Sequence, residues 1–170
     1  MLSTVREGAS LEPMPESLDP FALLPGTWRV AGTNFPMWLD GRRHHPRFEY
    51  RESDRPDVLD DVVTYDDADG RERTIVGRDR RRGDHLVWRG TGLLSIASSR
   101  WRVTGTSADG DVAALRFDRT LFTPAGVDVL VRDGARALDA RRALATELDR
   151  YGLTPEEFAS LSWLAGPSGG

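Results

Sequence analysis

The chain lacks two residue types that carry much enzyme chemistry: it has no cysteine, and all 23 residues of its Lys+Arg total are arginine. The absence of cysteine excludes disulfide bonds, thiolate nucleophiles and cysteine-ligated metal sites. The absence of lysine excludes a Schiff base and a lysine general base. Enzyme classes that depend on either residue are therefore excluded.

Long apolar runs are also absent. No run approaches the roughly 18–20 residues that a membrane-spanning helix needs, so no membrane span is predicted. The N-terminal stretch "MLSTVREGASLEPMPESLDP" has acids and prolines where a signal peptide needs an apolar core. With 39% hydrophobic and 29% charged residues, the composition is that of a globular protein. We therefore expect one cytoplasmic domain.

Charge and motifs exclude further classes. The net charge of -4 argues against a nucleic-acid binder, which needs a basic surface. No phosphate loop, dinucleotide fingerprint or Ser-His-Asp order occurs. His44 and His45 are adjacent in an Arg-rich segment without acidic partners at metal-ligand spacing. The sequence predicts no metal site and no cofactor.

Hydrophobic alternation predicts an all-β protein after a flexible leader at residues 1–19. In "RFEYRE", Phe48 and Tyr50 share one face, as expected for a half-buried strand. Turns such as "DADG" and "SADGD" place glycine where tight reversals need it. The expected strands are 27–34, 46–52, 58–66, 71–78, 84–91, 99–106, 111–119 and 126–132.

The period then changes to that of helices, expected at about 136–151 and 154–165. Thr154, Pro155 and Glu157 form the signature of a capping box with proline at the first helical position. Because the strand connections are short, neighbours in sequence should be antiparallel neighbours in space. The predicted fold of residues 20–170 is an eight-stranded antiparallel up-and-down barrel with C-terminal helices outside it.

The stretch "LLPGTWRVAGTNFPMW" carries a resemblance to a known family. Gly26 and Trp28 form a Gly-x-Trp at the first strand, Arg132 in "VDVLVRDG" ends the last strand, and "DPFALL" precedes the first. Together with the strand meander, these features resemble the lipocalin (calycin) family. Two departures are "TSADGD" in place of the family's middle motif and the absence of cysteine. The resemblance implies that Trp28 closes the barrel floor under Arg132 and that the barrel holds a small hydrophobic ligand.

Apolar side chains gather in the loops expected at the opposite end of the barrel. Loops normally face solvent, so a converging apolar set is informative. With Pro36 within it, segment 35–39 is expected to be a shaped loop rather than a helix, covering the barrel mouth. The alternative is a local mini-core or a homodimer contact. The set comprises Phe35, Met37, Trp38, Leu39, Leu93, Leu94, Ile96, Leu121, Phe122 and Pro124.

Strand parity predicts an apolar interior, which either encloses a cavity or is fully packed. The residues expected to point inward are Phe48, Tyr50, Leu86, Trp88, Trp101, Val103, Leu115, Phe117 and Val129. The candidate ligand-binding residues are Phe35, Met37, Trp38, Phe48, Tyr50, Trp88, Trp101, Phe117 and Phe122.

Two functions remain open at this point. The first is binding of a small hydrophobic molecule inside the barrel. The alternative is a lipocalin-fold cyclase or isomerase that acts on an apolar biosynthetic intermediate by controlling its conformation. The catalytic candidates are Asp61, Tyr65 and Tyr50, which can orient or protonate a ligand if they face inward. A docking module for another protein is a third hypothesis.

Overall fold

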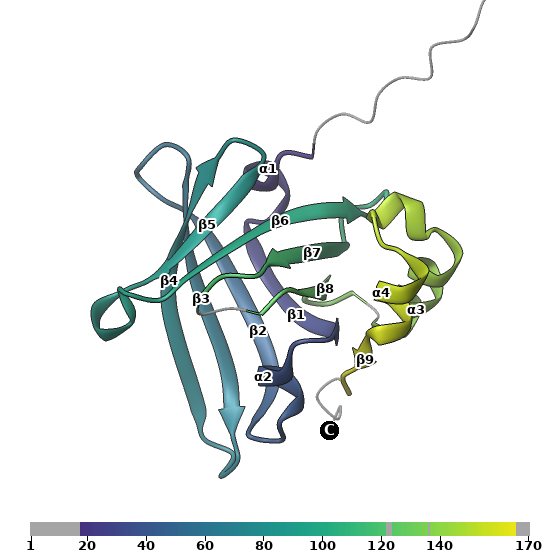
Figure 1. Cartoon of the computed structure of the whole chain (residues 1–170), viewed down its shortest axis with the longest axis horizontal. Helices are drawn as coiled ribbons and strands as arrows, with labels where there is room; N and C mark the ends of the chain where they lie inside the picture. The colour runs from purple at the N-terminus through teal and green to yellow at the C-terminus, as the bar shows by residue number, and fades with distance from the viewer. Residues whose placement is uncertain (1–17, 122–123, 136, 166–170) are drawn as a thin grey trace, which may run out of the picture.

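The computed structural model describes residues 18–121, 124–135 and 137–165, and the predicted leader therefore lies almost entirely outside the described residues. Its centre is an antiparallel barrel in which strand order follows sequence order (Figure 1). Strand β1 pairs with both β2 and β8, which closes the barrel. The predicted eight-stranded up-and-down barrel is confirmed. Its strands are β1 Gly26–Thr33, β2 Arg43–Glu52, β3 Val58–Asp67, β4 Glu72–Arg82, β5 His85–Gly90, β6 Ser98–Thr106, β7 Val112–Asp118 and β8 Gly126–Arg132.

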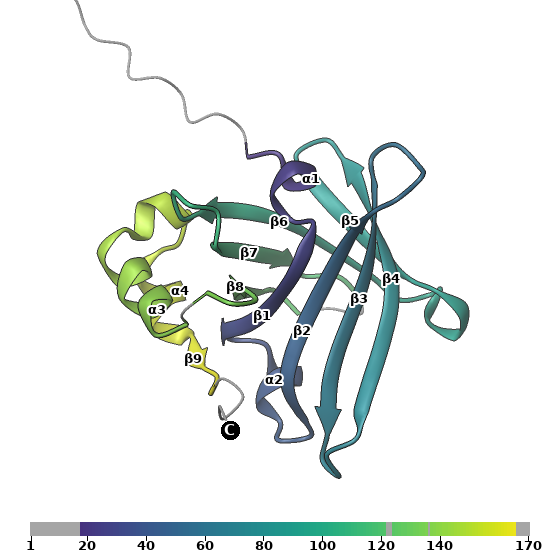
Figure 2. The ribbon, with the colours of Figure 1, turned by 180° about the vertical axis from the view of Figure 1, so that it is seen from behind.

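The closure between β1 and β2 is short. Their register runs only from Gly26 opposite Tyr50 to Arg29 opposite Arg47. Beyond that point β1 continues along β8, and the short helix α2 (Pro36–Leu39) lies beside the lower ends of β1 and β2 (Figure 2). At this end of the barrel, the neighbouring strands β1 and β2 therefore separate.

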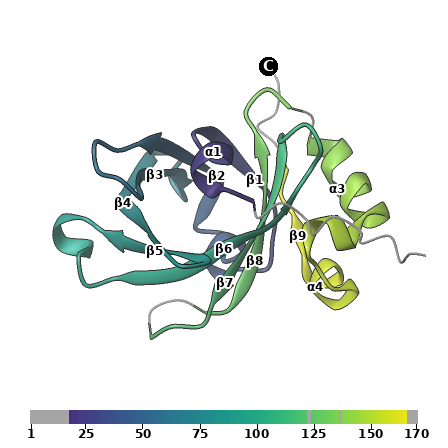
Figure 3. The same cartoon turned by 90° about the horizontal axis from the view of Figure 1, so that it is seen from above.

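The other end of the barrel is closed by Trp28. This side chain is fully buried, and its Nε1 donates a hydrogen bond to the carbonyl of Leu24 at 2.8 Å. The Arg132 guanidinium lies 4.2 Å from the Trp28 ring centre and donates to the carbonyls of Leu23 and Pro25. Helix α1 (Pro20–Leu23) lies across this end, as seen from above in Figure 3. The predicted stacking of Arg132 on Trp28 is confirmed.

The C-terminal elements pack on the outside of one wall of the barrel (Figure 3). They are α3 (Ala137–Thr146), the 3-10 turn η2 (Leu148–Tyr151), α4 (Pro155–Ser160) and β9 (Ser162–Trp163). The expected helix 136–151 is wrong only after Thr146, because Glu147 leaves the helical conformation with φ -134 and ψ 46. The capping box of Thr154 and Glu157 is present.

The expected helix 154–165 is too long by several residues. It ends at Ser160, and β9 then pairs with β1 through Gly32 opposite Trp163 and Thr33 opposite Ser162. The amide of Leu164 also donates to the carbonyl of Ala31. At Gly32 and Thr33, strand β1 no longer pairs with β2. Its backbone groups on that side need another partner, which favours a strand at β9 over another helical turn.

The outward-facing residues of β8 form a second core beneath these helices. Val127, Val129 and Val131 pack with Leu144 and Tyr151. The expectation that Val129 points into the barrel is therefore wrong. Because both faces of β8 are covered, its alternation gives no hydrophobic-to-polar contrast that marks the inner face.

No helix among the described residues is long and apolar enough to cross a membrane.

Candidate functional site

The barrel encloses a cavity of about 150 Å³. Eight of the nine candidate ligand-binding residues line it, and the ninth, Phe122, lies outside the described residues. The lining residues are Phe35, Met37, Trp38, Phe48, Tyr50, Asp61, Val63, Ile75, Trp88, Ser99, Trp101, Phe117 and Asp128.

Helix α2 brings Trp38 to the cavity. The expectation that Pro36 excludes a helix here is wrong, because Pro36 occupies the first helical turn, where its missing N–H needs no partner. Trp38 is buried, and its ring meets those of Phe48 and Tyr65 edge-on at 6.5 and 6.1 Å. The short helix thereby inserts an indole between the separating ends of β1 and β2.

The apolar residues of the other loops that the structure describes do not converge on the cavity. Leu93 is 100% exposed, Ile96 76% and Leu121 97%. The 3-10 turn η1 (Gly92–Leu94) carries the β5–β6 connection away from the mouth. The predicted convergence of Leu93 and Ile96 is wrong, while that of Phe122 concerns a residue outside the described ones. The homodimer contact stays a prediction.

Aromatic rings form a continuous network around the cavity. Phe35 meets Phe117 edge-on at 4.9 Å between ring centres. Phe117 stacks on Trp101 at 5.9 Å, and Trp101 lies 6.0 Å from Tyr50. Tyr50 in turn stacks on Phe48 at 6.0 Å. These residues come from β2, β6, β7 and the N-cap of α2, so barrel closure is what assembles the aromatic wall.

Three buried aspartates stand inside this apolar environment: Asp61 on β3, Asp79 on β4 and Asp128 on β8, exposed by 3%, 0% and 1%. Asp79 accepts a hydrogen bond from Nε1 of Trp101 at 2.7 Å. Asp128 accepts one from the Thr33 hydroxyl at 2.6 Å. The three carboxyl groups give an otherwise apolar interior its polar chemistry.

Asp61 and Asp79 form a pair because their strands are neighbours. Asp61 lies opposite Gly77 in the β3–β4 register, and Asp79 follows two residues later on the same face. Gly77 leaves room for Trp88, since a Cβ at this position would lie 2.2 Å from the indole Nε1. Trp88 can then donate a hydrogen bond to Asp61. The absence of a side chain at position 77 thus lets an indole reach the acid pair.

Burial changes the ionisation of all three acids. It raises the pKa of Asp79 and of Asp128 to about 7. It raises the pKa of Asp61 well above its ordinary value, and the nearby Asp79 raises it further. The pKa of Tyr50 is also raised, first by burial and then by the three aspartates. Protons are therefore retained in this cavity up to neutral pH.

One oxygen of each paired acid has no donor. Oδ1 of Asp61 and Oδ2 of Asp79 are buried without a hydrogen-bond partner in the part of the chain that the structure describes. A proton on one carboxyl group lets the two acids hydrogen-bond to each other. The pair can therefore hold one proton between its two carboxyl groups.

The catalytic candidates fall in two places. Asp61 and Tyr50 line the cavity. Tyr65 does not, because its half-buried ring lies between Trp38 and the Arg43 guanidinium, which is 5.6 Å from its centre. Sequence reasoning missed Asp79, Asp128 and Ser99. A signal that could have found Asp79 is its alternation in "RDRRRG" with the exposed Arg78 and Arg80.

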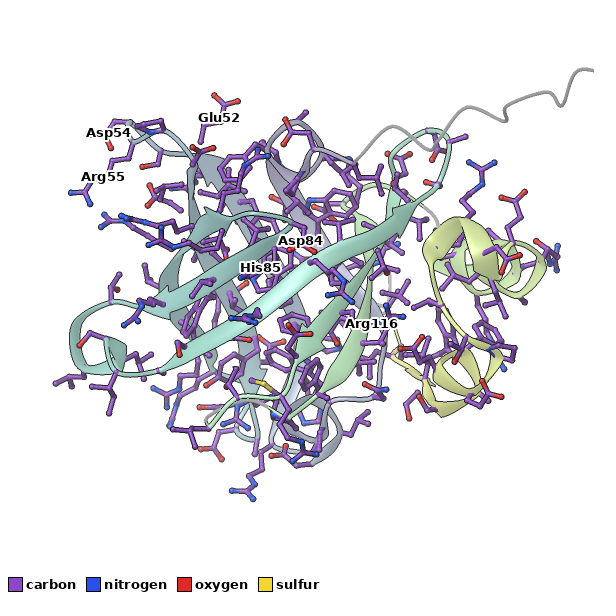
Figure 4. All side chains as sticks on the ribbon, turned by 45° about the horizontal axis from the view of Figure 1, so that its top comes forward. Glu52, Asp54, Arg55, Asp84, His85 and Arg116 are labelled. Carbon is purple, nitrogen blue, oxygen red and sulfur yellow. The ribbon has the colours of Figure 1, made fainter. Side chains whose placement is uncertain are left out.

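A larger concave surface lies on the outside of β4, β5 and β6, around His85. Its volume is about 790 Å³, and arginines line much of it. Figure 4 labels His85 at the start of β5 and Asp84 in the turn before it, and Glu52 at the end of β2 with Asp54 and Arg55 in the turn that follows. Arg78 on this surface is paired with Asp60. Within the described ranges, no group of three or more His, Cys, Asp or Glu residues could hold a metal ion.

Comparison with known proteins supports the fold only at the level of structure. No protein-family model matches the sequence, and no curated protein does. Lobster apocrustacyanin A1 is 14% identical over 86% of this chain and 79% of its own, with a TM-score of 0.61. Apocrustacyanin C1 is 15% identical over 85% and 78%, with a TM-score of 0.61. The siderocalin Ex-FABP is 14% identical over 85% and 95%, with a TM-score of 0.57.

Proposed function

We propose that this chain, whose fold is lipocalin-like as its first and last strands predicted, binds a small apolar or aromatic molecule inside the barrel. The observation that carries the proposal is the cavity of about 150 Å³ with its aromatic wall. A dry cavity of about this volume accommodates one benzene-sized ring in another protein. The ligand is thus expected to be about the size of a single ring.

Two further observations support a binding role. The lining combines many apolar side chains with a few polar groups, which is typical of small-molecule sites. The siderocalin Ex-FABP, which has the same fold, is described as functioning through dual ligand specificities. A fold alone does not determine function, so the lining residues carry the argument.

Titration with benzyl alcohol and toluene, followed by calorimetry and intrinsic Trp fluorescence, tests this proposal. We expect Trp38→Ala to weaken binding by about tenfold or more, because burying a large apolar side chain contributes roughly 1.5–3 kcal/mol. Val63→Phe should abolish binding by filling the cavity. The matched control is Val62→Phe, whose side chain leaves from the opposite face of β3. If neither probe saturates the wild type, the binding function is wrong.

A second candidate is the cyclase or isomerase, favoured by one observation. Asp61 is an acid with a strongly raised pKa in an apolar cavity, which is the environment of many general acids. Such an acid can protonate an apolar intermediate that the aromatic wall holds in a reactive conformation. Native mass spectrometry of the protein from its natural host separates the functions, since an unchanged co-purifying molecule favours the carrier.

A further inference from the structure

The described side chains that line the cavity can carry negative charge but not positive charge. Of the described residues that line the cavity, Asp61 and Asp128 are acidic and none is Arg or His. Asp79 lies next to Asp61 and is fully buried. A buried carboxylate is costly unless it is protonated or paired with a cation. The empty cavity favours protonation, and a cationic ligand offers the other solution.

The hydrogen bonds single out the pair Asp61–Asp79 over Asp128. Asp128 accepts a hydrogen bond from the Thr33 hydroxyl, and a hydrogen bond from Trp38 stabilises its charged form. In the pair, Trp88 and Trp101 supply one donor to each acid, and one oxygen of each acid remains without a donor. The pair is thus the part of the interior whose negative charge has the fewest donors, and Asp61 is its member at the cavity surface.

Aromatic side chains line the cavity beside Asp61. Tyr50, Trp88 and Trp101 line the cavity together with Asp61. Aromatic faces attract organic cations through the ring quadrupole, and most strongly where water is excluded. An anion is repelled by the carboxyl groups, while a cation gains both the rings and the charge.

If the barrel binds a small molecule, as proposed above, we propose that this ligand is a primary amine on a small apolar or aromatic body, with its ammonium group against Asp61 and with Asp79 behind Asp61. The ammonium group donates to the Asp61 carboxylate, and Asp79 shares the balancing charge. Below the raised pKa of Asp79, the pair of the empty protein holds two protons; one leaves to solvent when the ammonium binds and the other stays shared, so one negative charge faces one positive charge. The aromatic wall holds the apolar body of the ligand.

This arrangement has a defined pH dependence. Tyr50 on β2 is near enough to both acids for them to raise its pKa, and Asp128 on β8 acts on the same Tyr50. Both are neutral or acidic, so neither supplies a competing positive charge. Below the raised pKa of the acids, each ammonium bound displaces a proton, and affinity rises by up to tenfold per pH unit. A neutral ligand that accepts a hydrogen bond from a protonated acid shows the opposite trend.

The test compares benzylamine with benzyl alcohol, which differ only in an ammonium and a hydroxyl group on the same ring. We expect wild type at pH 8 to bind benzylamine about ten- to one-hundredfold more tightly, as a charge-assisted hydrogen bond contributes. The affinity for benzylamine should rise between pH 5 and 7, a window set by acids whose pKa is raised to about 7. Calorimetry in buffers of different ionisation enthalpy should detect the released proton.

Asp61→Asn and Asp79→Asn should remove the preference for benzylamine and retain binding of benzyl alcohol. The matched control is Asp60→Asn, because Asp60 is the neighbouring residue on the outer face, paired with Arg78. Equal binding of the two probes to wild type, at a pH-independent affinity, overturns the amine proposal and leaves the binding function intact. Failure of both probes to bind overturns the binding function itself.

Discussion

Trp28 is the single residue that contributes most clearly to the barrel floor. It is fully buried, donates to Leu24 and carries the Arg132 guanidinium on its face. We expect Trp28→Ala to lower the free energy of unfolding by about 3–5 kcal/mol, because it removes a large buried side chain. Arg132→Lys should cost less, since it keeps the charge and loses the planar stacking. Urea denaturation measures both changes.

The control at this scale is Trp163→Ala. Trp163 is half-buried on the outside of the barrel, where its ring contacts Phe158. Its loss should therefore cost less than the loss of Trp28. If the two variants lose equal stability, Trp28 is not the floor of the core.

At the scale of elements, the docking of η2 on β6 depends on Gly105. A Cβ at this position would lie 2.1 Å from the carbonyl oxygen of Arg150 and 2.3 Å from Cα of Tyr151. Because both atoms belong to the backbone, they cannot rotate away as a side chain does. We expect Gly105→Ala to lower the melting temperature and to increase hydrogen exchange in residues 137–163. The barrel strands should keep most of their protection.

Gly32→Ala is the matched control for this contact. A Cβ at Gly32 approaches the ring of Trp163 at 3.2 Å, and this side chain can shift by a few tenths of an ångström. We expect a smaller loss of stability than in Gly105→Ala. The opposite order contradicts the docking role assigned to Gly105.

At the scale of the whole molecule, the buried acids make stability depend on pH. Burial raises the pKa of Asp79 from an unfolded-like value of 3.8 to about 7, and that of Asp128 likewise. Between these values the folded state binds more protons than the unfolded state. The free energy of unfolding therefore falls as pH rises through this window, by about 1.4 kcal/mol per pH unit for each such group.

Thermal and urea unfolding at pH 5, 6, 7 and 8 measures this dependence. Asp128→Asn and Asp79→Asn should each remove one titrating group from the folded state. Each variant should therefore reduce the slope of the free energy of unfolding against pH by the contribution of one proton. Exposed acids with a lowered pKa, such as Asp67 and Asp84, act mainly below their ordinary value of 3.8 and leave this window unchanged. A stability that rises from pH 5 to 8 contradicts the assignment of protonated acids to the cavity.

Much of the barrel follows from local signals in the sequence. Alternating side chains such as Phe48 and Tyr50 mark strands, and glycines such as Gly70 and Gly110 mark turns with φ near +76°. The pairing of Trp28 with Arg132 was predicted from the family resemblance, and the strand residues of the cavity lining were predicted from parity, which fixes which side chains share a face. The helix lengths were less predictable from the sequence. The last helix ends where β9 begins, and β9 forms because β1 offers an unpaired edge.

By itself, the sequence determined the strands, their turns, the order of the barrel and most of its aromatic lining, because each depends on residues close together in the chain. The tertiary structure decided which face of β8 points inward, because helices cover its outer face and remove the contrast between the two sides. It also brought Asp61 and Asp79 together across neighbouring strands and placed them in an apolar cavity. Their retained protons arise from enclosure, which exists only in the folded barrel.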